Sequence, residues 1–177
     1  MRTLDFVESE EQAMVRDTAR EVADEFGTEY WRERDATGTF PHAFWDALGE
    51  AGIHGLMIPE EYGGAGMGMV EMSLVIETLC GGGCGMGGAM IPVMSAVMGA
   101  VDVAQHGSAE QKERYLPGMA TGERMMAISI TEPDAGSNTL NTETTAEKDG
   151  DEYVIEGKKV WATLAHEADD ILLVTRT

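Results

Sequence analysis

The chain has 177 residues and carries 32 acidic side chains against 12 Lys and Arg, a formal net charge of −20. This charge argues against nucleic acid and anionic membrane surfaces as partners. Because 43% of the residues are hydrophobic, the chain does not have the composition of a disordered acidic segment, and we expect a folded protein with an acidic surface.

The acidic excess suggests adaptation to high salt, because a Debye length of about 3 Å at 1 M screens the self-repulsion of such a surface. Residues 1–26 lack the charged and apolar regions of a signal peptide, and no run of some 18 apolar residues predicts a membrane span. Cys80 and Cys84 have no second Cys or His pair at metal spacing. These features predict a cytoplasmic protein with reduced thiols.

The first predicted helix begins after Ser9, which forms a capping box with Gln12, and it stops at Gly27. Steps of three and four residues place four apolar side chains on one face of it. These are Val15, Ala19, Val22 and Phe26.

A second helix is predicted with Pro41 in its first turn, Phe44 and Leu48 buried, and an end near Gly52. Residues 63–68 are expected to form a loop.

Residues 70–80 and 91–105 are apolar enough for two buried helices, and the glycine-rich residues 81–88 separate them. These glycines could cradle a phosphate, but no Gly-Lys-Ser/Thr ending follows them, which favours a flexible connection. The 13 methionines are interpreted as adaptable core side chains. A capping box of Ser108 and Gln111 opens a further helix that is expected to end before Pro117.

After Gly122 the period changes to two, with Met126, Ile128 and Ile130 alternating with small or polar residues, as in a strand. Further strands are predicted at residues 142–147, 153–156, 159–164 and 171–175. The predicted fold is therefore mostly α with a β part. An N-terminal α-helical bundle domain (residues 1–122) precedes the beginning of an antiparallel β-barrel domain (residues 123–177). The last strand has no later partner, which suggests a fragment of a larger chain.

Residues 128–137 (ISITEPDAGS) run from a strand into a turn that Pro133 stiffens. Gly136 allows a close backbone approach to a ligand, and Thr131 and Ser137 offer hydroxyls. By itself, this segment favours a strand and tight turn that bind nothing.

Four motifs in order resemble those of acyl-CoA dehydrogenases. TEPDAGS at residues 131–137 is similar to the family signature T-E-P-x-A-G-S-D, and PEEYGG at residues 59–64 to its P-E-x-Y-G-G loop. Residues 107–117 resemble G-[ST]-x-E-Q-K-x-x-Y-L-P, and residues 150–161 resemble G-D-x-Y-x-[LI]-N-G-x-K-x-[WF]. The resemblance spans residues 59–161, and it implies a larger chain of helical, β and helical domains.

The resemblance implies FAD as cofactor and an acyl-CoA as substrate, converted to a 2-enoyl-CoA by an oxidoreductase of fatty acid metabolism. Ser137 would border the CoA portion. The implied cofactor contacts lie on two segments and are Ile128, Ile130, Thr131, Gly136, Trp161 and Thr163.

The catalytic base, a glutamate in the family, would lie beyond Thr177, so these 177 residues alone are expected to be inactive. An electron-transfer flavoprotein would accept the electrons, and a homo-oligomer, dimer or tetramer, is expected. The sequence departs from the family motifs at Asn138, Ala162 and Leu164, which stand where Asp, Ile and Asn are usual. None of these departures removes an implied flavin contact.

Two alternatives stay open: an acyl-CoA oxidase or flavin monooxygenase of the same fold, and a non-catalytic helical interaction module. Periodicity alone favours Trp161 as a core aromatic residue of a strand. The four histidines lack periodic partners and are interpreted as structural or surface residues, with no metal site. They are His42, His54, His106 and His166.

Overall fold

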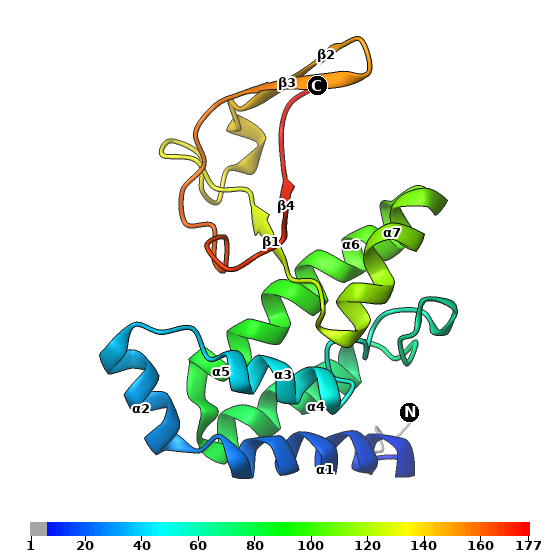
Figure 1. Ribbon diagram of the computed structural model, residues 1–177, viewed down its shortest axis with the longest axis vertical. Helices are drawn as coiled ribbons and strands as arrows, with labels where there is room; N and C mark the ends of the chain where they lie inside the picture. Colours follow the sequence, from blue (N-terminus) through cyan, green and yellow to red (C-terminus); the bar gives the residue numbers. More distant parts are fainter. Residues whose placement is uncertain (1–6) are drawn as a thin grey trace, which may run out of the picture.

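The computed structural model describes residues 7–177 as a block of helices from which a small β region extends (Figure 1). The bounds of the α-helices are α1 Glu10–Glu25, α2 Thr28–Thr37, α3 His42–Glu50, α4 Met69–Leu79, α5 Gly85–Pro92, α6 Val101–His106 and α7 Ala109–Thr121. Shorter or wider helical turns are η1 Glu60–Tyr62, η2 Cys80–Cys84, η3 Val93–Ala100 and η4 Thr139–Asn141. The strands are β1 Met126–Ser129, β2 Thr145–Asp149, β3 Glu152–Glu156 and β4 Asp170–Leu173.

Both predicted capping boxes are present. Gln12 N–H donates to Ser9 Oγ at 3.1 Å and Gln111 N–H to Ser108 Oγ at 3.2 Å, and each glutamine side chain accepts the N–H of its cap residue. Helix α7, however, does not end before Pro117 but continues to Thr121 and is closed by Gly122 in the left-handed region. A proline inside a helix forfeits one hydrogen bond to the preceding turn, and the burial of Leu116 and Met119 offsets that loss.

The predicted apolar face of α1 is buried and lies along α4, whose Met72 and Val75 are fully buried. Phe44 from α3 is also fully buried and meets the rings of Phe26 and Trp31 edge to face, at centroid distances of 5.4 and 5.0 Å. Trp31 lies on α2, a helix that the apolar periodicity did not predict. These contacts form the main core of the helical block.

The glycine-rich segment is not a flexible connection but part of the helical path, with wide π-type turns on either side of α5. Gly83 has φ +104°, which produces the bend between α4 and α5. A Cβ on Gly82 would lie 2.4 Å from the Cβ of Ala23, so the absence of side chains lets α1 approach closely. The glycines therefore serve helix packing.

The continuous helical path Met69–His106 is long and apolar enough to cross a membrane, with a mean hydropathy of 1.6 in its most apolar window. Half of that window is buried inside the fold, and a helix in the core of a globular protein can have the same length, hydropathy and burial. In Figure 1 this path runs through the middle of the helical block.

The β region contains a parallel pair, β1 with β4, and an antiparallel hairpin, β2 with β3. Met126 lies opposite Asp170, and Thr145 opposite Glu156. The expected antiparallel pairing is present between β2 and β3, whereas β4 pairs in parallel with the earlier strand β1. Beyond β4, Arg176 N–H donates to Thr144 O at 2.8 Å.

The strand predicted at residues 159–164 does not form. Trp161 and Leu164 have φ of +60° and +67°, in the left-handed region that a strand cannot contain, and residues 163–167 form a turn. The predicted strands near residues 145, 153 and 171 are present with shifted ends.

Candidate functional site

The β1 strand carries the first group of predicted site residues into the interior. All four of its residues are buried, and Ile128 is 9% exposed. One side of the strand packs on η3, where Gly99 leaves room for Met126. Ile130 and Thr131 follow the strand and are half-buried, so they form a rim between the core and solvent.

The turn after Thr131 is held by two backbone hydrogen bonds between Glu132 and Ala135, of 2.9 and 3.2 Å. Beyond it, Gly136 and Ser137 are exposed, and Gly136 N–H donates to Asn138 Oδ1 at 3.2 Å. No atom lies within 4 Å of a Cβ built on Gly136. Within residues 7–177 the space beside this glycine is therefore open, as a close-approaching ligand would require.

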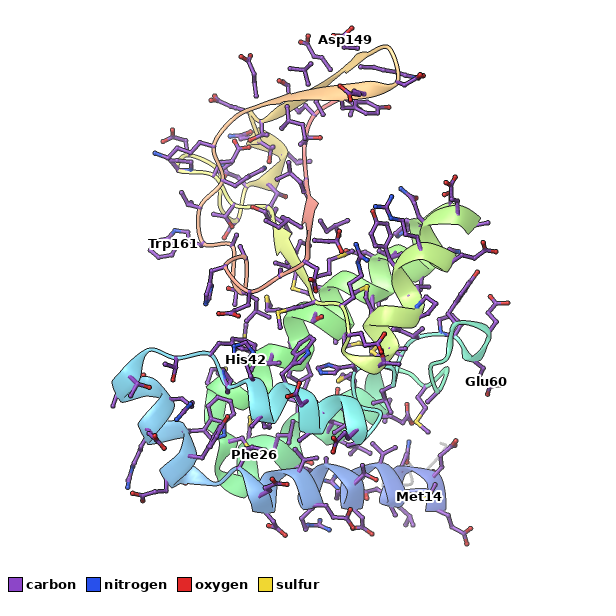
Figure 2. All side chains as sticks on the ribbon, viewed as in Figure 1. Met14, Phe26, His42, Glu60, Asp149 and Trp161 are labelled. Atoms are coloured by element: carbon purple, nitrogen blue, oxygen red, sulfur yellow. The ribbon has the colours of Figure 1, made fainter. Side chains whose placement is uncertain are left out.

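The second predicted group lies on the loop of residues 159–163, and a hydrogen bond joins it to the first. Val160 N–H donates to Thr131 O at 2.9 Å, which places the next residue, Trp161, at the end of β1. The Trp161 side chain is 87% exposed and projects outward from the loop (Figure 2). An indole this exposed on backbone of φ +60° is unusual for a core residue, so the core interpretation of Trp161 does not hold.

The polar groups at this rim can fit a flavin. Thr131 is half-buried and Thr163 is exposed, and among residues 7–177 neither hydroxyl makes a hydrogen bond. Both hydroxyls can therefore donate to or accept from a ligand. An apolar wall (Ile128, Ile130), an uncovered aromatic ring and two available hydroxyls match the needs of a planar ring with a polar edge.

A buried ion pair next to this rim was not predicted from the sequence. Lys159 Nζ lies 2.9 Å from Glu132 Oε1, with side-chain exposures of 8% and 6%. The Glu132 carboxylate also accepts the N–H groups of Glu143 (2.6 Å) and Thr144 (2.9 Å). The N–H of Glu143, followed by the Thr144 hydroxyl, Lys159 and the Thr144 N–H, lowers the pKa of Glu132 to about 2.

No group of three potential metal ligands, histidines included, occurs among the described residues. His54 is buried against the ring of Trp45, and its Nε2 lies 2.9 Å from Trp45 O. Burial lowers the pKa of His54 to about 4. His42 Nε2 lies 3.5 Å from a Glu167 oxygen at the surface, so the structural and surface interpretation fits.

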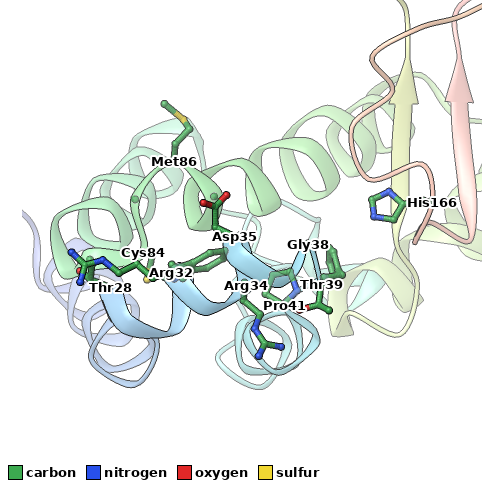
Figure 3. A pocket seen from close by; sticks show the side chains of 15 residues that line it. Thr28, Arg32, Arg34, Asp35, Gly38, Thr39, Pro41, Cys84, Met86 and His166 are labelled. Carbon is green, nitrogen blue, oxygen red and sulfur yellow. The ribbon is translucent and has the colours of Figure 1, made fainter.

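The cavity in Figure 3, of about 580 Å³, lies between α2 and the glycine-rich segment. Arg32, Arg34 and Asp35 from α2 line it, and His166 stands at its end nearest the strands. None of its lining residues belongs to residues 128–131 or 159–163, so its size alone does not mark the reactive centre.

Several motif residues prove to be structural. In the motif at residues 59–64, Gly63 has φ +86°, and a Cβ on Gly64 would lie 2.0 Å from Ile58 O. The motif at residues 107–117 contains the cap of α7. Only the motifs at residues 131–137 and 150–161 reach the rim at the end of β1.

Comparison with known proteins assigns the helical region and the β region to described protein domains. The family model described as "Acyl-CoA dehydrogenase, N-terminal domain" matches residues 9–123, and that described as "Acyl-CoA dehydrogenase, middle domain" matches residues 127–177. The acyl-CoA dehydrogenase FadE12 of Mycobacterium tuberculosis is 37% identical over 177 residues, which are 100% of this chain and 45% of that protein.

Solved structures agree. The FAD complex of PigA matches with a TM-score of 0.90 and 26% identity, over 98% of this chain and 45% of that one. Butyryl-CoA dehydrogenase from Megasphaera elsdenii matches with a TM-score of 0.87 and 27% identity, over 96% of this chain and 45% of that one. The chain thus spans about 45% of the length of these relatives, and it belongs to the acyl-CoA dehydrogenase family.

Proposed function

We propose that the protein provides one wall of the flavin site of an FAD-dependent acyl-CoA dehydrogenase. The observation that carries this proposal is the hydrogen bond from Val160 N–H to Thr131 O, which joins the two predicted contact segments into one rim. FAD, when bound, supplies the two-electron acceptor for α,β-dehydrogenation of an acyl-CoA thioester to a 2-enoyl-CoA.

The residues of this chain would bind, orient and shield the cofactor. Ile128 and Ile130 exclude water from one side of the site, and the hydroxyls of Thr131 and Thr163 donate to the polar edge of the ring. Trp161 covers an adjacent side, which would bury much of its 87% exposed surface. Gly136 offers a backbone approach without a side chain, and Ser137 borders the CoA portion of the substrate.

We assign no catalytic base to residues 7–177. Glu132 is held ionised by two N–H groups and Lys159, and a carboxylate with a pKa of about 2 is a weak base at neutral pH. Glu77 lies on α4 and pairs with Arg16 at 2.8 Å. Since this chain matches about 45% of the length of its relatives, we propose that the base belongs to sequence beyond these 177 residues.

The remaining expectations are part of the same proposal: residues 1–122 and 123–177 as separate domains, a cytoplasmic location without a membrane span, a dimer or tetramer, and an electron-transfer flavoprotein as acceptor. The net charge of −20 supports an acidic, halophilic protein. Circular dichroism over a KCl series tests halophily. We expect the folded fraction to rise with salt, and full folding at low salt would contradict the idea.

An acyl-CoA oxidase or a flavin monooxygenase is the second candidate, because the fold does not fix the substrate. A PigA structure on this fold is described with FAD and proline. Sustained peroxide formation from an acyl-CoA would favour the oxidase, whereas dependence on an electron-carrier protein favours the dehydrogenase. A non-catalytic helical module is disfavoured by the presence of Thr131, Trp161 and Thr163.

The test begins with titration of the purified protein with FAD, followed by absorption and by Trp fluorescence. We expect saturable binding that weakens when Trp161 is replaced by Ala, while the exposed Tyr153→Ala leaves it unchanged. A longer form that contains the base should lose its flavin absorption band on anaerobic addition of an acyl-CoA. Absence of FAD binding by both forms would exclude the proposal.

A further inference from the structure

We propose that Glu132 and Lys159 act as a positioning pair that sets the backbone of residues 130–131 and the loop of Trp161 for cofactor binding. This inference rests on the proposed flavin site and assigns to it two residues that do not contact the cofactor.

The pair joins three segments that are distant in sequence. Lys159 Nζ donates to Ile130 O at 2.8 Å as well as to Glu132 Oε1 at 2.9 Å. The Glu132 carboxylate receives the backbone N–H groups of Glu143 and Thr144. One buried charge pair thereby connects residues 130–132, 143–144 and 159–160. The hydrogen bond from Val160 N–H to Thr131 O adds a further link between the first and third of these segments.

Close backbone packing supports the same junction. Gly157 has φ +154°, and a Cβ on it would lie 2.3 Å from the Thr144 hydroxyl oxygen. This contact lets the chain before Lys159 approach residue 144, so that the lysine reaches Glu132 from a fixed direction. A change in the backbone position of Lys159 would also move Val160 and Trp161, because these residues follow it directly in the chain.

The burial of the pair argues for a positional role. Among the ion pairs of residues 7–177 it alone has both side chains less than a tenth exposed. Buried ion pairs contribute little net stability, because the cost of desolvating the two charges offsets their attraction. Apolar side chains of similar volume often give the same or a higher stability. What an apolar pair could not supply is directed hydrogen bonding to Ile130 O and to two backbone N–H groups.

Lys159→Met tests the proposal against Lys158→Met, the same change at the neighbouring exposed lysine. We expect Lys159→Met to raise the FAD dissociation constant at least about tenfold, the size of effect that loss of a supporting hydrogen bond has on metal affinity at metal sites. We also expect it to shift the flavin absorption band. Lys158→Met should leave both unchanged.

The double variant Glu132→Gln/Lys159→Met separates position from stability. It leaves no unpaired buried carboxylate, so its urea midpoint should recover toward that of the parent. Its FAD dissociation constant should stay raised, because the hydrogen bond to Ile130 O is still missing. If FAD affinity instead followed the urea midpoint through the series, the pair would be a structural element only and the proposal would be overturned.

Hydrogen exchange of backbone amides, measured in the flavin-free protein, tests the role of the pair without relying on FAD binding. Lys159→Met should accelerate exchange of the Val160 N–H while the β1–β4 amides exchange as in the parent. An unchanged Val160 rate would overturn the positioning role even if FAD binds. If neither the parent protein nor the longer form binds FAD, the proposed function fails, and the exchange rates alone decide whether the pair positions the loop.

Discussion

Phe44, Leu48 and Met72 in the helical region are fully buried, whereas Tyr153, Val154 and Ile155 in β3 are 58%, 53% and 52% exposed. The helical region therefore has an apolar core of its own. The β2–β3 hairpin has none among the described residues, and the backbone beside it is fixed by the polar network of Glu132 and Lys159. Two different kinds of interaction thus hold the two regions.

The largest expected effect comes from the apolar core. Phe44→Ala removes a ring that packs edge to face on Phe26 and Trp31, and truncation of a fully buried Phe costs about 3–5 kcal/mol. Tyr153→Ala, the same kind of truncation in β3, should change the free energy of unfolding by less than about 0.5 kcal/mol. Urea unfolding followed by circular dichroism measures both. Similar losses would mean that β3 is covered in solution.

The next largest effect is the pH dependence of the free energy of unfolding, to which His54 in the helical region and Glu132 in the β region contribute over different pH ranges. Buried, neutral His54 has a folded pKa of about 4 against a usual 6.5, so the unfolded chain binds the extra proton in between. The contribution of neutral His54 to the free energy of unfolding should be fully present above pH 6.5. It should fall by about 3 kcal/mol between pH 6.5 and pH 4, at roughly 1.4 kcal/mol per pH unit. Glu132 differs: its contribution is present above pH 4.5 and is lost as pH falls toward about 2.

Urea unfolding at half-unit steps from pH 7 to 4 measures this slope. The matched variant His54→Gln keeps a side-chain donor but does not titrate, so its stability should depend less on pH over that range. The comparison uses slopes and not absolute stabilities, because loss of the ring contact with Trp45 also costs packing energy. Equal slopes in the two proteins would assign the pH dependence to other groups.

Sequence patterns predicted the features that depend on nearby residues. The capping boxes at Ser9 and Ser108 involve partners three residues away, and the apolar face of α1 follows directly from helical spacing. The two segments of the candidate rim were also found, although only through resemblance to a family, because nothing local shows that residues 131 and 160 meet.

Features that depend on distant partners were missed. Lys159 and Glu132 are 27 residues apart, so neither spacing nor periodicity indicates their contact. The sequence predicts a strand at residues 159–164, but Lys159 and the left-handed backbone of Trp161 and Leu164 bend this segment into a loop. The parallel pairing of β1 with β4 likewise depends on the path of residues 130–169, which form the crossover connection between the two strands.

The glycine-rich segment offers a smaller effect inside the helical region. A Cβ on Gly88 would lie 2.4 Å from the Cβ of Cys84 and 3.3 Å from Trp31, so Gly88→Ala should cost about 1–3 kcal/mol through overpacking. Gly81→Ala meets nothing within 4 Å and should be neutral or stabilise by up to about 1 kcal/mol. Thermal unfolding of both variants measures the difference, and equal behaviour would support the flexible connection that the sequence suggested.

The smallest effect tests the helix that leads into the β region. Ser108→Ala removes the cap of α7 and leaves the Gln111 N–H without its side-chain acceptor, which should cost about 1 kcal/mol. Ser73→Ala is the control, since its hydroxyl only donates to Met69 O within α4 and its removal should change stability by less than about 0.5 kcal/mol. If the cap matters locally, amide exchange in Ser108→Ala should accelerate in the first turn of α7 and not at the Val160 N–H. Acceleration at Val160 as well would show that the helical region and the rim at the end of β1 unfold as one unit, contrary to the difference between them described above.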